Sequence, residues 1–222
     1  MTHIPTSALS RRALAAPLFV ALTTSASAQQ PATSTPITPS TPPSGPDTRL
    51  TPRFAGPETA PVTVTEFFSL TCGHCATFHN NVWPEVKAKL VDTGRVRFVW
   101  RDFPLDGLAL AAACVARSLT AERYEPFIGI LFAQQNRWAF AESGRQTDEL
   151  AKLAALAGID RAAFDRITAD EVLRRGVYEM RVRAVREHNV NATPSFLFNS
   201  RLQSGGMTFE RFEQAVRDAP RA

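Results

Sequence analysis

The sequence predicts an α/β fold in which a long helical stretch interrupts the sheet. Two observations carry this prediction. A β-rich apolar run at residues 62–68 precedes a helical pattern and a second β-rich run at 95–100, a β-α-β unit whose strands we expect to be parallel, with a right-handed crossover. Helical patterns then continue to about residue 190, after which the chain returns to strand character and ends on one more helix.

Residue types define the β-α-β unit. Val62-Thr-Val-Thr-Glu-Phe-Phe68 is apolar enough to be a central strand buried on both faces. Residues 73–91 follow as a long helix, which we expect to kink at Trp83-Pro84 because proline removes a backbone hydrogen bond and clashes with the preceding turn. Gly94 ends this helix, and residues 95–100 form the second strand.

The stretch from about residue 104 to 172 predicts an all-helical insert packed on the sheet. Its expected helices are an alanine-rich one at 108–119, one at 122–135, one beginning at Thr147 and one beginning at Asp160. A longer helix from Asp170 follows, with an apolar stripe that starts at Leu173. We therefore expect no strand of the sheet between about residues 104 and 172.

Strand character returns at residues 191–198. Asn199-Ser200 provides a turn into a short partner strand at 201–203, and a terminal helix at 208–218 completes the pattern. The predicted order is therefore β-α-β, helical insert, α-β-β-α.

The first 28 residues predict an export signal. Arg11-Arg12 form a basic region, residues 13–22 are a short apolar stretch, and Ala26-Ser27-Ala28 is a small-residue cleavage site. The apolar stretch is too short to span a bilayer, so we expect no transmembrane segment in the mature chain. Ser10-Arg11-Arg12-Ala13-Leu14 also resembles a twin-arginine signal, which leaves the export route open between the general secretion and twin-arginine systems.

Residues 29–52 are rich in Pro, Thr and Ser and predict an extended, disordered tether. Residues 53–222 remain as one domain that contains the helical insert. The formal net charge of +4 includes two signal-sequence arginines, and no basic cluster with interleaved aromatic residues occurs. This weak charge balance argues against a nucleic-acid partner.

Cys72-Gly73-His74-Cys75 stands where the first strand runs into a helix, and it is the motif that carries the chemistry. A helix N-terminus stabilises a thiolate, and thiols placed there have pKa values of roughly 3.5–7.5 instead of about 8.5. We therefore expect Cys72 to be the nucleophile. His74 adds a second donor or a positive charge, and Cys75 follows as the resolving thiol. Stabilising the thiolate favours the reduced protein, which makes the disulfide oxidising.

Other uses of the two cysteines are less consistent with the sequence. A structural disulfide across four residues gains little closure entropy. A zinc site on Cys72, Cys75 and His79 lacks a fourth ligand, and haem attachment requires a histidine where Ala76 stands. We expect no metal and no organic cofactor, because the cysteines are themselves the redox group. The third cysteine, Cys114, has apolar neighbours and is expected to be a buried, inert thiol, with a regulatory or intermolecular thiol as the alternative.

Three segments together resemble the DsbA-like branch of the thioredoxin superfamily. They are Glu66-Phe-Phe-Ser-Leu-Thr-Cys-Gly-His-Cys75, Phe103-Pro-Leu-Asp106 before the helical insert, and Thr193-Pro194 before a strand. The resemblance extends from about Arg53 to the C-terminus. It implies a thioredoxin fold of the α/β class, with a sheet of four or five strands and an inserted all-helical domain, and thiol-disulfide exchange on exported polypeptides.

The resemblance also implies roles for individual residues. Cys72 matches the attacking cysteine, Cys75 the resolving cysteine, and His74 the histidine that stabilises the thiolate. Glu66 matches an acidic residue beneath the active site. Because burial in an apolar strand favours a protonated carboxyl group, Glu66 is expected to relay the proton of Cys75. The alternative for Glu66 is a strand-end carboxylate that faces water.

Pro194 matches a cis-proline beside the active-site disulfide, and Thr193 before it is expected to present its backbone to an extended substrate. Gly73 belongs to the same substrate-contacting group. Gly73 and Thr193 also depart from the best-known periplasmic oxidases, which have proline and valine at these positions. Both departures weaken the prediction of a strongly oxidising couple.

The resulting hypothesis is a periplasmic oxidoreductase that introduces disulfides into exported polypeptides with free thiols. The resemblance implies reoxidation by a quinone-linked membrane oxidase. One alternative is a disulfide isomerase or reductase kept reduced by a membrane partner, although isomerases of this type usually dimerise through a folded N-terminal domain where this chain has a tether. The other is a holdase that binds polypeptides without electron transfer. His79, Trp83 and Phe78 are expected to pack or to line a groove rather than to take part in catalysis.

Overall fold

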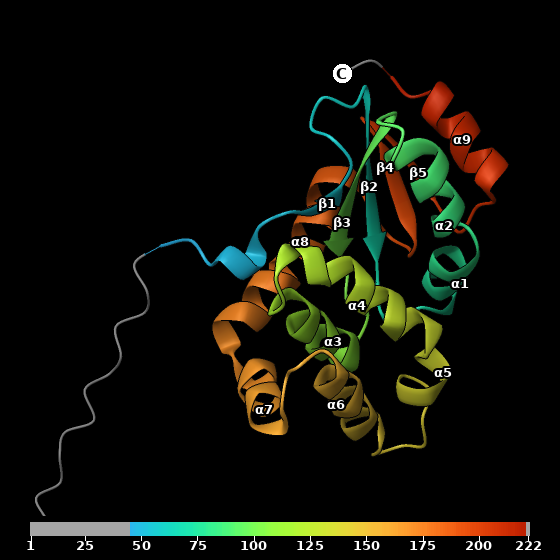
Figure 1. Cartoon of the computed structure of the whole chain (residues 1–222). Coiled ribbons are helices and arrows are strands. Elements are labelled where there is room, and N and C mark those ends of the chain that lie inside the picture. Colours follow the sequence, from blue (N-terminus) through green and yellow to red (C-terminus); the bar gives the residue numbers. More distant parts are fainter. Residues whose placement is uncertain (1–44, 221–222) are drawn as a thin grey trace, which may run out of the picture. The chain divides into compact units, whose positions relative to one another are not determined.

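The computed structural model describes residues 45–220 of the 222-residue chain (Figure 1). The predicted signal segment, residues 1–28, and most of the predicted tether lie outside the described residues, so both stay predictions. Among the helices of residues 45–220, none is both long and apolar enough to cross a bilayer.

A five-stranded mixed sheet forms the centre of the domain. Its strands are β1 (Arg53–Ala55), β2 (Val62–Phe68), β3 (Val96–Asp102), β4 (Ser195–Phe198) and β5 (Arg201–Ser204), arranged in the order β1-β3-β2-β4-β5. β2 and β3 are parallel, as predicted, and the other neighbouring pairs are antiparallel. β1 was not predicted, because a three-residue edge strand is too short to show a periodic pattern.

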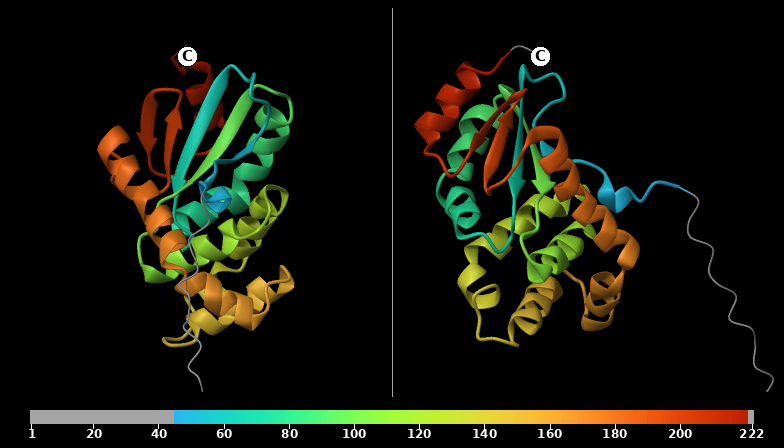
Figure 2. Two further views of the ribbon diagram at one scale, coloured as in Figure 1. Left: turned by 90° about the vertical axis from the view of Figure 1, so that its left-hand side faces the viewer. Right: turned by 180° about the vertical axis from the view of Figure 1, so that it is seen from behind.

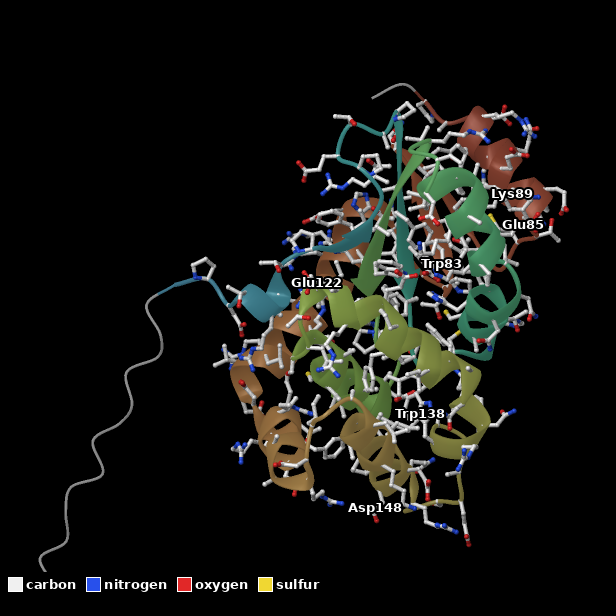
Figure 3. All side chains as sticks on the ribbon, in the orientation of Figure 1. Trp83, Glu85, Lys89, Glu122, Trp138 and Asp148 are labelled. Atoms are coloured by element: carbon white, nitrogen blue, oxygen red, sulfur yellow. The ribbon has the colours of Figure 1, made fainter. Side chains whose placement is uncertain are left out.

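Helices cover both faces of the sheet (Figures 1 and 2). One face carries α1 (Gly73–Asn81), α2 (Trp83–Val86), a π-helical turn η2 (Lys87–Val91) and α9 (Phe209–Arg217), and the other carries α8 (Glu171–His188). The predicted helix over residues 73–91 is interrupted at Val82, directly before the Trp83-Pro84 pair that we expected to kink it. The indole of Trp83 faces the sheet, whereas Glu85 and Lys89 lie on the outer side (Figure 3).

The helical insert lies beyond one end of the sheet (Figure 1). It comprises α3 (Gly107–Arg117), α4 (Ala121–Ala133), α5 (Gln135–Trp138), α6 (Gln146–Leu156) and α7 (Arg161–Ala169), after which α8 returns to the sheet. The carboxylates of Asp106, Asp160 and Asp170 cap α3, α7 and α8 by accepting hydrogen bonds from backbone N–H groups in the first turn. These local caps explain why the helix starts could be predicted closely from the sequence.

Aromatic side chains fill the space between the sheet and α1. The ring centroid of Phe78 lies 4.6 Å from that of Phe196 and 5.9 Å from that of Phe212. Burial of each such ring contributes roughly 1.5–3 kcal/mol. Phe67 points to the opposite face of the sheet, where it packs with Ala184 of α8. β2 is thus buried on both faces, as its apolar sequence predicted.

The last residues of the predicted tether are folded onto the domain. A short 3₁₀ turn, η1 (Thr48–Leu50), packs against α8, where the Leu50 side chain occupies the space that a Cβ at Gly176 would fill. Arg49 forms a 2.8 Å ion pair with Asp170, and the buried guanidinium of Arg117 donates to backbone carbonyls of the turn. Folded structure therefore begins a few residues before the predicted boundary at residue 53.

Candidate active site

Cys72 and Cys75 lie at the junction between β2 and α1. Cys72 is the N-cap residue of α1, with extended backbone dihedral angles, and Cys75 falls in the first turn. Cys72 is half-buried, whereas Cys75 has no exposed surface. The predicted placement of the motif at a helix N-terminus is therefore confirmed, and one sulfur is accessible while the other is sheltered.

The pKa of Cys72 is lowered from 9.0 to about 5, and the main cause is a hydrogen bond from the thiol of Cys75. The Thr193 side chain and the backbone N–H groups of Cys75 and His74 act in the same direction, while burial opposes them. A thiolate at a helix N-terminus accepts such bonds well because the first N–H groups have no partner within the helix. The lowered pKa favours the thiolate form of Cys72 at neutral pH, as its predicted role as the nucleophile requires.

Cys75 has the opposite electrostatics. Its pKa is raised well above 9.0, first by burial and then by the neighbouring Cys72 sulfur and the charge of Glu66. The buried sulfur therefore remains a thiol until a group close by accepts its proton. This asymmetry is the one that the predicted roles of Cys72 as the attacking and Cys75 as the resolving cysteine require.

The peptide bond between Thr193 and Pro194 is cis, as expected from the sequence. The carbonyl oxygen of Thr193 lies 3.4 Å from the Sγ atom of Cys72. The loop before β4 therefore brings its backbone directly against the reactive sulfur, although the two residues are far apart in the chain.

His74 and Gly73 are exposed at the start of α1. His74 lines a groove of about 460 Å³ together with Met207, which precedes α9, and Phe209, the first residue of α9. Its backbone N–H makes a contact that lowers the pKa of Cys72, and the role predicted for its imidazole stays a prediction.

Glu66 is fully buried on β2. The alternative of a strand-end glutamate facing water is therefore wrong. Its Oε2 atom lies 2.8 Å from Nε2 of His79, and the two side chains are 0% and 2% exposed. His79 packs in the core, as expected, and its pairing with Glu66 is a contact that the sequence did not predict. The signal in the sequence was the spacing of Cys75 and His79, which are four residues apart and so share one face of α1.

Gln135 of α5 is a second residue that sequence reasoning missed. Its side-chain amide donates to the carbonyl oxygens of Leu70 at 2.8 Å and Cys72 at 3.1 Å. It thereby ties the helical insert to the chain that leads into the motif. Cys114, by contrast, is buried on α3, and burial raises its pKa to about 12, as expected for an inert thiol.

A family model described as thioredoxin matches residues 48–218, which is most of the chain. The chain belongs to the thioredoxin family. A relative from Rickettsia prowazekii, named "putative protein-disulfide oxidoreductase", is 30% identical over 162 residues, covering 70% of this chain and 56% of the relative. The chain thus spans little more than half the length of the Rickettsia relatives it matches.

Solved thioredoxin-fold structures agree with this assignment. Alpha-DsbA1 from Wolbachia pipientis is 27% identical, with a TM-score of 0.69 over 76% of this chain and 90% of that chain. A protein-disulfide isomerase from Novosphingobium aromaticivorans shares the fold, with 22% identity and a TM-score of 0.67 over 75% of this chain and 96% of that chain. The predicted DsbA-like thioredoxin fold with an inserted helical domain is confirmed. The domain has the fold and the paired cysteines of a thiol:disulfide oxidoreductase.

Proposed function

We propose that this protein is a periplasmic thiol:disulfide oxidoreductase that introduces disulfides into newly exported proteins by exchange with its Cys72–Cys75 disulfide. The observation that carries the proposal is the contrast between a Cys72 pKa of about 5 and a buried Cys75 whose pKa is raised. A stabilised Cys72 thiolate favours the reduced form of the protein. The disulfide form is therefore the one that tends to accept electrons.

The exchange proceeds in two balanced steps. A substrate thiolate attacks the Sγ atom of Cys72, the bond between Cys72 and Cys75 breaks, and Cys75 leaves with the electron pair and takes up a proton. A second substrate thiolate then attacks the substrate sulfur of the mixed disulfide and releases Cys72 as a thiolate. The substrate loses two electrons and gains a disulfide, and the protein is left as a dithiol. The low pKa of Cys72 makes it a good leaving group in the second step.

The substrate is an extended polypeptide in this proposal. The Thr193 carbonyl beside the Cys72 sulfur offers a backbone acceptor next to the reacting atom, and Gly73 presents no side chain that would block approach. Backbone pairing of this kind tolerates many substrate sequences. Broad recognition suits an enzyme that acts on many exported proteins.

Two parts of the proposal rest on the sequence. The predicted signal at residues 1–28 supports export to the periplasm, and the DsbA-like resemblance supports reoxidation by a quinone-linked membrane oxidase. Each can be tested separately, the first by fractionation of cells expressing the full chain and the second by quinone-dependent reoxidation of the dithiol in isolated membranes.

The deciding experiment uses the disulfide form of the purified protein and a reduced, unfolded test protein. We expect stoichiometric oxidation of the test protein, and no oxidation by Cys72→Ser. Equal results from both proteins would eliminate every redox function and would leave the holdase alternative.

Equilibration with glutathione buffers then separates oxidase from isomerase or reductase. A reduction potential less negative than about −180 mV supports the oxidase, and a value near that of thioredoxin, about −270 mV, would favour a reductase instead.

A further inference from the structure

A buried carboxylate and a buried imidazole form a pair close to Cys75. Glu66 on β2 and His79 on α1 meet at 2.8 Å between Oε2 and Nε2, with almost no exposed surface on either side chain. Cys75 lies one helical turn before His79, on the same face of α1. The charge of Glu66 raises the pKa of Cys75, which places the carboxylate within electrostatic reach of the buried thiol.

The surroundings of the pair are apolar. In the sheet register Glu66 stands between Trp100 on β3 and Phe196 on β4. The ring of His79 stacks on Phe132 of α4 at 4.3 Å between centroids and has Trp83 at 6.3 Å. The other rings within contact range of His79 belong to Phe68 and Phe78.

The charged groups near Glu66 and His79 either bond to other residues or belong to the pair itself. Glu125 of α4 accepts a 3.0 Å hydrogen bond from the indole of Trp83. Glu66 is therefore the titratable group that the contacts of the described residues place against His79, and Cys75 lies within electrostatic reach of Glu66.

One carboxylate oxygen of this pair is left without a partner. Within the part of the chain that the structure describes, Oε1 of Glu66 is buried and accepts no hydrogen bond. Asp102, the other buried carboxylate, is fully engaged instead, since Arg117 and Tyr124 donate to its two oxygens. A buried carboxylate oxygen without a partner costs free energy, and this one is free to accept a proton from a neighbouring group.

We propose that His79 is a positioning residue that holds Glu66 in place and carries protons between Glu66 and solvent whenever Cys75 loses or gains a proton. This inference rests on the proposed thiol-disulfide exchange. The side chain of His79 suits the task because it retains 2% exposure, while that of Glu66 has none. The imidazole is thus the side of the pair through which protons can reach water.

The proton balance is simple. When the thiol of Cys75 attacks a mixed disulfide at Cys72, a sulfur–sulfur bond forms between the two cysteines and the bond to the departing thiolate breaks. The proton of Cys75 passes to Oε1 of Glu66. The Glu66–His79 pair then carries one extra proton, and the imidazole of His79 releases this proton to solvent. The reverse sequence protonates Cys75 when it leaves.

The test follows the reaction of the dithiol protein with oxidised glutathione by acid quench and mass spectrometry. The first step forms the mixed disulfide at Cys72, and the second is its displacement by Cys75. In wild type we expect the second step to change little between pH 5 and 7. In His79→Gln we expect it to be at least tenfold slower at pH 6 and to rise about tenfold per pH unit, because Glu66 is no longer held in place to accept the proton of Cys75 and hydroxide from solvent must remove it. The first step should be the same in both proteins.

The two steps separate the two hypotheses. Failure of the wild type to form the mixed disulfide faster than Cys72→Ser would reject the proposed function. A normal first step with an unchanged pH profile of the second step in His79→Gln would reject only the role of His79. His188→Gln is the matched control, because this histidine is half-exposed on α8 and packs on Phe67. Its profile should equal that of wild type.

Further measurements keep the inference testable if His79→Gln does not fold. Glu66→Gln retains a hydrogen-bonding partner for the imidazole and should show the same loss in the second step, and the double variant should be no slower than Glu66→Gln alone. In wild type, the ¹⁵N signals of the His79 ring should shift between the dithiol and disulfide forms, with His188 as internal reference. Identical ring signals in both forms would overturn the proposal.

Discussion

Replacing the resolving cysteine should weaken the acidity of the attacking one. The hydrogen bond from Cys75 is the largest cause of the low pKa of Cys72, about 5. A hydrogen bond to a charged group contributes about 1.5–3 kcal/mol, and one pKa unit corresponds to about 1.4 kcal/mol. Because Cys72 is half-exposed and solvent screens the contact, we take the low end of this range. Cys75→Ala should therefore raise the pKa of Cys72 by about one unit.

The assay is titration of the thiolate by its ultraviolet absorbance, with the rate of alkylation as a second readout. A rise of one unit reduces the thiolate fraction at pH 6 from about 90% to about 50%. The midpoint is more informative than the rate at pH 7, because both proteins are then about 90% or more thiolate and the rate reports mainly the higher nucleophilicity of the more basic thiolate. Cys114 does not interfere, since its pKa is about 12.

Cys75→Ser is the control, because serine keeps a donor at the same position. Its titration midpoint should stay within about half a unit of wild type. The reasoning is refuted if Cys75→Ala titrates like wild type, or if serine and alanine raise the midpoint equally. Either result would mean that the helix N-terminus, and not the second thiol, determines the acidity of Cys72.

Three further predictions follow from burial and charge. Cys114 should react with alkylating reagents only after denaturant unfolds the protein, and reaction of the native protein at the rate of an exposed thiol would contradict its burial. Arg117→Met should lower the free energy of unfolding by about 3–5 kcal/mol, because Asp102 is then buried without its ion-pair partner; a loss below about 1 kcal/mol in denaturant titration would contradict this. The dithiol form should lose stability relative to the disulfide form as the pH falls. The pKa of Cys72 is depressed in the folded state, so the stabilisation is complete above about pH 9 and disappears as the pH falls through about 5. Equal decreases in melting temperature for both redox forms would rule it out.

The elements that could be predicted are those with local signals. The alternating and apolar pattern of β2, the capping aspartates of the insert and the Trp83-Pro84 kink all act through neighbouring residues in the chain. β1 and η1 have no such signal. They exist because their residues find partners far away, β1 against β3 and Leu50 against Gly176.

The residues of the candidate site also fall into those with a local sequence signal and those without one. Cys72, Cys75 and Glu66 could be proposed from one continuous motif, and Thr193-Pro194 from the family resemblance. His79 and Gln135 could not, because their roles depend on contacts across elements, from α1 to β2 and from α5 to the chain before α1. A histidine on a helix can have many roles, and the residue that its side chain contacts in the tertiary structure determines which one it has.

By itself the sequence determined the redox chemistry and the thioredoxin-like class, because a cysteine pair at a strand-to-helix junction is a local arrangement. Tertiary structure alone decided which sulfur is exposed, that the backbone of Thr193 reaches Cys72, and that the imidazole of His79 pairs with the carboxylate of Glu66. The physical reason is that the acidity of a thiol and the cost of a buried charge depend on burial and on hydrogen-bond partners. Residues brought together from distant parts of the chain supply both.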